Sequence, residues 1–127
     1  FATLMAGLGL DPDKMPVSRK PSYGWGGAMG PAQFIPSTWI LYKDRIAKMT
    51  GESPPNPWTP RTAIFASALL MADNGADKGT RESERLAALR YFAGWGNAKK
   101  AAYAFYGDDV IGFADEYQRD IDILDGK

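Results

Sequence analysis

The chain has 127 residues, a length typical of one domain with a single core, and its 15 basic side chains balance 15 acidic ones. This balance argues against a nucleic-acid-binding protein, which normally carries a basic stripe. Cysteine and histidine are absent, which excludes a thiol nucleophile, a Ser-His triad and a structural zinc site. No apolar run approaches the roughly 20 residues that span a bilayer, so we expect no membrane span.

The first residues are interpreted as the end of a helix. Residues 1–8 are interpreted as the last two turns of a helix that stops at Gly7 or Gly9. They show no initiator Met, no basic region and no cleavage pattern, so they do not form a signal peptide. We therefore expect a fragment whose first helix begins upstream, and a short N-terminal helix without a cap is the alternative.

A long loop and a helix are predicted next. Residues 11–35 are rich in proline and glycine and have no sustained period, and loops of this length in compact domains are usually functional. Pro36 then begins a helix that ends at Gly51. The apolar residues of this helix recur at helical spacing: Trp39, Tyr42, Ile46 and Met49.

Two further helices are predicted from their caps. Thr59 and Pro60 provide an N-cap and a first helical position, and the apolar run 63–72 indicates a helix buried on nearly all sides. Thr80 caps the next helix, which stops at Gly94.

The C-terminal part is predicted to contain a short Ala-rich helix at 98–104 and a last helix that starts around Asp108, with an acidic N-cap. The last helix carries one apolar stripe: Val110, Phe113, Tyr117, Ile121 and Leu124. No convincing run of alternating strand residues occurs. We therefore expect an all-α fold in a single domain over 1–127.

Residues 26–39, with the sequence GGAMGPAQFIPSTW, form the first segment that contains candidate functional residues. Its glycines allow the backbone to approach a ligand closely. Gln33 stands just before a helix, and its amide donates and accepts at once, which suits the hydroxyl and N-acetyl groups of a sugar. The alternative is a tight Gly-Pro turn in which Gln33 serves as the helix-entry cap.

Two more segments carry tyrosines. Residues 88–94, ALRYFAG, contain Tyr91 at a helix end, and residues 105–110, FYGDDV, contain Tyr106 ahead of the last helix. Taken alone, a Tyr-Phe pair at a helix end is more often core, and a tyrosine ahead of a capped helix is common. Whether Tyr91 and Tyr106 are interpreted as site residues therefore depends on the first segment.

Together the three segments resemble the lytic transglycosylases, which cleave bacterial peptidoglycan. Residues 26–39 are similar to the family pattern Gly-Ala-(Met/Leu)-Gly followed by Gln, an apolar residue and Pro. Residues 88–94 are similar to Ala-x-x-Tyr-Asn-Ala-Gly, with Phe92 in the place of Asn, and residues 105–110 resemble the closing Tyr-x-x-x-Val element. The segments occur in the family's order, so the resemblance covers 23–117.

The resemblance implies a lysozyme-like helical fold with a cleft for glycan strands. It implies that Gln33 contacts the N-acetylated sugar beside the scissile bond and that Ile35 forms an apolar wall. The other implied substrate-binding residues are Tyr91, Tyr106, Met29, Phe34 and Tyr23, with Met29 and Phe34 supporting the wall or packing beneath it. Trp25 offers further aromatic surface. No metal or cofactor is implied, and the substrate implies a location in the bacterial cell envelope, periplasmic or extracellular.

The family's chemistry uses one glutamate, found in a Glu-Ser pair upstream of the first segment. This acid protonates the glycosidic oxygen, and the muramic acid's own C6 hydroxyl then forms a 1,6-anhydro product, so a second carboxylate is not needed. No glutamate occurs between Phe1 and Gly26. We therefore expect no catalytic residue in this chain, with the glutamate upstream of Phe1 on a missing N-terminal part of the same domain.

The glutamates that the chain does contain are interpreted as solvated charges, or charges favoured by a helix dipole, on a loop, helix starts and faces: Glu52, Glu82, Glu84 and Glu116. Two other hypotheses remain open. One is a non-catalytic module that binds peptidoglycan or chitooligosaccharides and has lost the acid. The other is a structural helical domain whose motif is coincidental.

Overall fold

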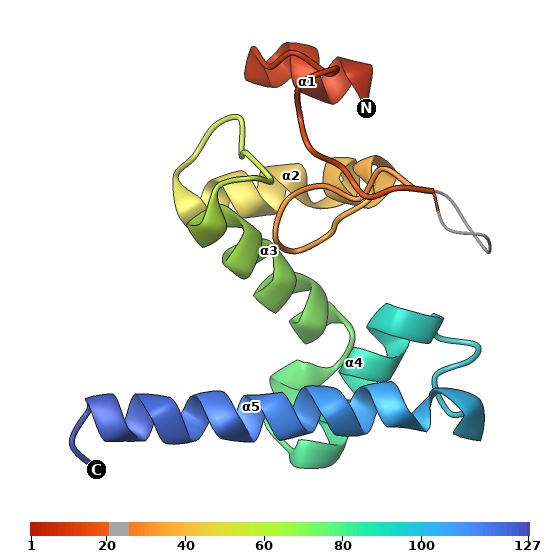
Figure 1. The fold of residues 1–127 in the computed structure, drawn as a ribbon, viewed down its shortest axis with the longest axis vertical. Coiled ribbons are helices and arrows are strands. Elements are labelled where there is room, and N and C mark those ends of the chain that lie inside the picture. Colours follow the sequence, from red (N-terminus) through yellow and green to blue (C-terminus); the bar gives the residue numbers. More distant parts are fainter. Residues whose placement is uncertain (21–25) are drawn as a thin grey trace. The chain divides into compact units, whose positions relative to one another are not determined.

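The computed structural model describes residues 1–20 and 26–127 (Figure 1). The regular structure of these residues is helical and includes no strand, which confirms the predicted all-α class. The chain forms two compact units, Phe1–Leu69 and Leu70–Lys127. No helix in the described ranges combines the length and the apolar composition needed to cross a membrane.

The first unit begins with two helices that end as predicted. Helix α1 (Ala2–Leu8) stops at Gly9, and helix α2 (Pro36–Thr50) stops at Gly51; both glycines have the left-handed backbone conformation, with φ of 66° and 75°. Glycine adopts this conformation without steric cost, which explains why both helices end there. The core of this unit lies around α2: Met5, Met29, Phe34, Trp39 and Ile46. Met49, predicted on the same face, is instead 48% exposed.

Helix α3 (Pro60–Asp73) starts at the predicted proline but is not buried on nearly all sides. Its buried residues are Thr62, Ala63 and Ala66, whereas Ile64 is 69% exposed. The prediction was wrong because an apolar composition on all faces does not select which face packs. The small residues form the packed face of α3.

The second unit is built on helix α4 (Arg81–Ala93) and helix α5 (Ala104–Leu124), with short 3-10 turns at η1 (Ala76–Lys78) and η2 (Ala101–Tyr103). The predicted cap of α4 is confirmed: the Thr80 side chain accepts a hydrogen bond from the Ser83 backbone N–H, and the Ser83 hydroxyl accepts one from the Thr80 N–H. This reciprocal pair satisfies two N–H groups that the helix start leaves unpaired. Helix α4 ends at Gly94, as expected.

Helix α5 starts at Ala104 and not around Asp108, so Tyr106 lies in its first turn. The predicted short helix at 98–104 is replaced by a turn and η2. The reason for the difference is Gly107, which is buried where α5 packs against α4. A Cβ there would lie 3.0 Å from Leu89 Cγ, so this glycine serves close helix packing and does not end a helix.

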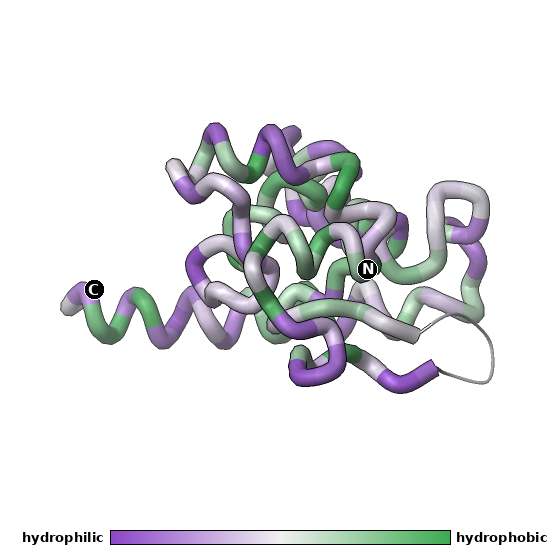
Figure 2. Tube along the Cα trace, turned by 90° about the horizontal axis from the view of Figure 1, so that it is seen from above, coloured by the Kyte–Doolittle hydropathy of each residue, from purple (hydrophilic) through white to green (hydrophobic). Residues whose placement is uncertain are grey.

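The apolar stripe of α5 is not a core face in this structure. Phe113, Tyr117 and Leu124 are 58%, 67% and 86% exposed, and Gly107 is the buried residue of this helix. Hydrophobic and hydrophilic residues alternate along the helix toward the C-terminus (Figure 2). The predicted helical period is therefore present, and the apolar stripe that it forms is largely exposed.

Candidate functional site

The segment that carries the first motif is held by backbone hydrogen bonds on both sides. The Ser18 N–H donates to the Ala28 carbonyl oxygen at 2.9 Å, and the Ala28 N–H donates to the Ser18 hydroxyl at 3.0 Å. Further along, the Met29 N–H donates to the Phe34 carbonyl oxygen at 2.9 Å. These bonds close the loop 29–34 into a fixed turn that presents Gln33.

Gly30 fixes where this turn lies. Its φ is 62°, and an added Cβ would lie 1.9 Å from the Pro57 carbonyl oxygen, far inside van der Waals contact. No side chain can occupy that position without moving backbone. The close approach brings the turn against residues 57–58, which follow the end of the turn by more than 20 positions in the chain.

Gln33 has an unusual backbone conformation for a non-glycine residue, with φ of 54°. Its backbone N–H and its side-chain Nε2 both donate to the Gly30 carbonyl oxygen, at 3.2 and 2.9 Å. Helix α2 has Ile35 as its N-cap and no side-chain cap bond, so Gln33 is not the helix-entry cap. The Gln33 side chain is exposed, and its Oε1 accepts no hydrogen bond from the described residues. The amide therefore keeps an acceptor for a ligand.

A groove of about 460 Å³ lies beside Gln33. It is lined by Pro16, Val17, Ser18, Gly30, Pro31, Gln33 and Trp58. The indole N–H of Trp58 donates to the Pro16 carbonyl oxygen at 2.9 Å, which fixes the ring at the groove. Val17 is 40% exposed and adds apolar surface. The groove thus combines one open amide with a held aromatic ring.

Sequence reasoning did not single out Trp58 as a site residue. It lies in a proline-rich loop, far along the chain from the motif, and the contact between Gly30 and Pro57 and the hydrogen bond to Pro16 bring it to the groove. An aromatic residue in a proline-rich loop was the one available signal. That signal does not indicate which other segment of the chain Trp58 contacts.

The other predicted residues of the first motif divide into two groups. Ile35 is 42% exposed, as a wall residue requires, although it does not line the Gln33 groove. Met29 and Phe34 are 0% and 3% exposed and pack beneath the surface, where the Phe34 ring meets the Trp39 ring edge-on with centroids 5.4 Å apart. Tyr23 and Trp25 lie outside the described residues.

In the second unit, the structure brings together the two predicted tyrosines. Burial raises the pKa of Tyr91 and of Tyr106, and the proximity of Tyr106 raises the pKa of Tyr91 further. Both phenols are therefore neutral at physiological pH, and a neutral phenol both donates and accepts hydrogen bonds. Tyr91 is 39% exposed, so a ligand has access to it.

Phe92, which stands where the family has Asn, stacks on Tyr106. The ring centroids are 4.2 Å apart and the planes differ by 9°. Phe92 also makes edge contacts with Tyr103 and Phe105. Phe92 thus makes an aromatic contact that fixes the Tyr106 ring.

Glu52 has a structural role at the start of α3. One carboxylate oxygen accepts from the Thr59 hydroxyl at 3.3 Å, and the other accepts from the Thr62 hydroxyl. The carboxylate therefore lies at the helix N-terminus, where a negative charge is favourable. This arrangement agrees with the interpretation of Glu52 as a structural charge rather than a general acid.

The described residues contain no cluster of acidic side chains that could hold a metal ion. Comparisons with protein-family models, curated proteins and solved structures found no match to this chain. The similarity to lytic transglycosylases thus rests on the three sequence segments and stays a prediction. Of the predicted site residues, Gln33 alone lines the groove in the described structure, and Tyr91 and Tyr106 come together in the second unit.

Proposed function

We propose that this chain supplies the glycan-binding cleft of a peptidoglycan lytic transglycosylase. Such an enzyme cleaves the MurNAc-β-1,4-GlcNAc bond without water and leaves 1,6-anhydroMurNAc, in the bacterial cell envelope. The observation that carries the proposal is the groove in which the open Gln33 amide lies beside the Trp58 indole. This combination of groups is suited to an N-acetylated sugar.

The groove supplies two kinds of sugar contact. The Gln33 Oε1 accepts a hydrogen bond from a sugar hydroxyl or from the N–H of an acetamido group, and Nε2 has a second proton to donate. Trp58 and Val17 offer apolar surface that packs against the C–H face of a pyranose ring. Since Nε2 is held on the Gly30 carbonyl, the amide is oriented before the ligand arrives.

In the second unit, Tyr91 and Tyr106 offer two neutral hydroxyl groups to a sugar. Tyr91 and Tyr106 are neutral at physiological pH, as ordinary phenols are, and burial raises the pKa of both further from that range. Both can therefore hydrogen-bond to sugar oxygens without adding a negative charge. This is the role we assign to the pair.

In this proposal the general acid is a glutamate outside the 127 residues. Residues 1–26 contain none, and Glu52 is committed to the two threonines at the start of α3. The acid protonates the glycosidic oxygen, and the bond from that oxygen to C1 of MurNAc breaks. The C6 hydroxyl oxygen of the same sugar then bonds to C1 and returns its proton to the carboxylate.

The first experiment incubates the chain with purified peptidoglycan and searches for 1,6-anhydro products by mass spectrometry. We expect binding to the insoluble wall without products, and products once a segment with a Glu-Ser pair precedes residue 1. In that longer protein, Gln33→Ala should lower turnover at least tenfold, a loss of about 1.4 kcal/mol in transition-state binding. Gln118→Ala is the matched control, because that glutamine bonds only to Asp122 on α5. Unchanged turnover in Gln33→Ala would refute the assignment.

The second candidate function is a non-catalytic module that binds peptidoglycan or chitooligosaccharides. The absence of glutamate from residues 1–26 favours it over a complete enzyme. It predicts retention on the insoluble wall, sensitivity to Gln33→Ala, and no anhydro product from the longer protein. A chain that is not retained on the wall at all contradicts both functions.

A further inference from the structure

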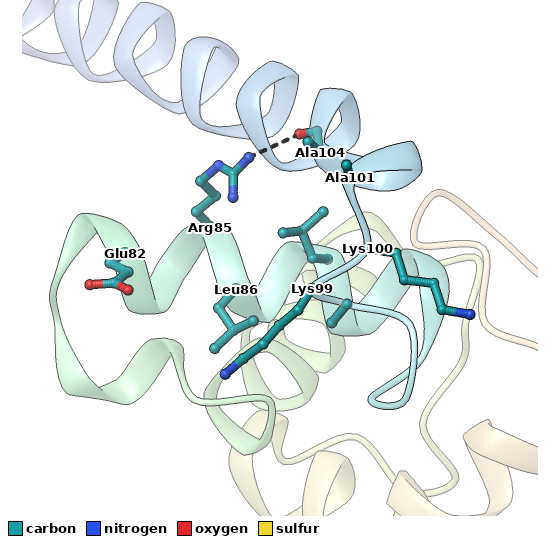
Figure 3. Close-up of a pocket in the computed structure, with 9 residues that line it drawn as sticks. Glu82, Arg85, Leu86, Lys99, Lys100, Ala101 and Ala104 are labelled. Carbon is teal, nitrogen blue, oxygen red and sulfur yellow. Dashed lines mark hydrogen bonds between the residues drawn. The ribbon is translucent and has the colours of Figure 1, made fainter.

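The C-terminal part of α5 extends beyond the helix that packs against its start. Arg85 of α4 donates to the Ala104 carbonyl oxygen at 3.3 Å, which attaches the beginning of α5 to α4 (Figure 3). Arg81, the first residue of α4, pairs with Asp115. After Asp115, α5 continues past α4 toward the C-terminus (Figure 1). About two and a half turns of α5 therefore extend beyond α4.

This part of α5 exposes apolar side chains that acidic side chains flank. Four side chains share one face of the helix and form what we call the C-terminal stripe: Phe113, Tyr117, Ile121 and Leu124. Glu116 and Asp120 follow Phe113 by three and seven residues, so both lie along one edge of the stripe. Neither acid forms an ion pair with any residue that the structure describes. A surface that covers the C-terminal stripe therefore meets two unpaired carboxylates.

The charge of α5 limits which surfaces can cover the C-terminal stripe. The helix carries six acidic side chains and one basic side chain. Two α5 helices would therefore repel each other, and an anionic membrane surface would repel α5 as well. A complementary surface must combine exposed apolar side chains with basic ones.

Helix α2 provides such a surface in the same chain. It carries three basic side chains and one acidic side chain, which makes it the most basic α-helix among the described residues. Leu41 is 79% exposed, and Lys48, seven residues later, lies on the same face, away from the buried Trp39 and Ile46. Lys48 forms no ion pair within the described part of the chain. Helix α2 thus presents an exposed leucine beside an unpaired ammonium group.

We propose that the C-terminal stripe binds helix α2 of a second copy of this chain, in a twofold dimer. Each copy supplies one α5 and one α2, so a twofold axis forms the contact twice and covers both surfaces on both copies. The stripe packs on Leu41 of the second copy, and Asp120 lies beside Lys48. The opposite charges of the two helices determine which faces meet. Glycan takes no part in this contact, so the dimer is independent of the proposed function.

Sedimentation equilibrium of the complete chain at several concentrations measures the association. We expect a monomer–dimer equilibrium with a Kd of micromolar order at low salt, weakened by added salt because exposed charge pairs are screened. Lys48→Glu and Asp120→Lys should each raise the Kd about tenfold, because the altered contact occurs twice and becomes repulsive. Lys43→Glu is the matched control, because Lys43 follows Leu41 by only two residues and lies on a different face of α2.

A mixing experiment tests the contact between the two faces directly. Lys48→Glu and Asp120→Lys are complementary across both contacts of a mixed dimer, so their mixture should recover the wild-type affinity. Lys43→Glu mixed with Asp120→Lys has the same net charges but keeps one repulsive contact, so this mixture should bind more weakly than wild type. The three substituted side chains are exposed, so circular dichroism of each variant should match wild type.

Three outcomes overturn the inference. A wild-type chain that stays monomeric at all concentrations up to its solubility limit excludes the dimer. Equal weakening by Lys43→Glu and Lys48→Glu assigns the association to overall charge and not to one face of α2. A mixture of Lys48→Glu and Asp120→Lys that associates no better than either variant alone excludes contact between these faces. Each of these results leaves the Gln33 groove untouched, so failure of the dimer and failure of the proposed function are distinguishable.

Discussion

Replacing Gly30 by alanine should destabilise the first unit strongly. The position has φ of 62°, and the new Cβ would lie 1.9 Å from the Pro57 carbonyl oxygen and 2.7 Å from its carbonyl carbon. Both atoms belong to backbone, so no side-chain rotation relieves the overlap. The turn 29–34 must move away from residues 57–58, and the Gln33 groove opens with it.

The magnitude follows from a comparison with Gly51→Ala. Gly51 has a similar φ of 75° but open space around an added Cβ, so its substitution carries only the left-handed backbone cost of about 1 kcal/mol. Gly30→Ala carries the same cost and an overlap that adds about 2 kcal/mol, within the range for overpacked sites. The difference between the two variants therefore measures the contact with Pro57.

Urea unfolding, followed by tryptophan fluorescence and circular dichroism, provides the assay. Among the described tryptophans, Trp39 and Trp58 lie in the first unit and Trp95 in the second, so fluorescence reports mainly on the first unit. With an m-value of about 2 kcal/mol per molar urea, Gly30→Ala should unfold about 1 M earlier than Gly51→Ala. Equal midpoints for the two variants would refute the close approach of Gly30 to Pro57.

Three other predictions concern the second unit. Phe92→Ala should destabilise it by about 2 kcal/mol, because it removes the stack on Tyr106 and two edge contacts, whereas Phe105→Ala removes one contact and should cost about half as much in thermal unfolding. The pKa values of Tyr91 and Tyr106 are raised in the folded protein, so the unfolded chain loses these protons first as the pH rises. The free energy of unfolding should therefore fall as the pH rises above about 10 and level off above the folded pKa values. The urea midpoint of the double variant Tyr91→Phe with Tyr106→Phe should fall less over the same pH range. Arg90→Lys should cost about 1 kcal/mol, since the guanidinium group donates to the Asn74 carbonyl and lies 3.8 Å from the Trp95 ring centroid, and a melting temperature equal to wild type would contradict that role.

Most helix boundaries could be predicted because they depend on local chemistry. Pro36 and Pro60 begin helices, Thr80 caps one, and Gly51 and Gly94 end two, and each role follows from backbone geometry within a few residues. The same reasoning failed at Gly107. A glycine followed by two aspartates is also a common helix boundary, and only its packing against α4 explains why the helix continues.

Burial and the groove could not be predicted, because they depend on contacts far apart in the chain. The period of α5 was correct, but periodicity does not provide a partner for Phe113 or Tyr117, which remain exposed. Gln33 was found from its motif, whereas Trp58 reaches the same groove through the contact at Gly30 and the hydrogen bond to Pro16. Motif residues can be found from sequence, and the residues that complete their surroundings need coordinates.

At position 33, the residue that would give the most stable fold differs from the residue that the proposed ligand contact requires. At φ of 54° a glutamine is strained by roughly 1 kcal/mol, which glycine would relieve and asparagine would reduce. A library of variants at position 33 selected only for heat resistance should therefore become enriched in glycine and asparagine. If the proposed function is right, the same library selected for binding to peptidoglycan should retain glutamine, so the two enrichments would separate what the fold prefers from what the proposed ligand requires.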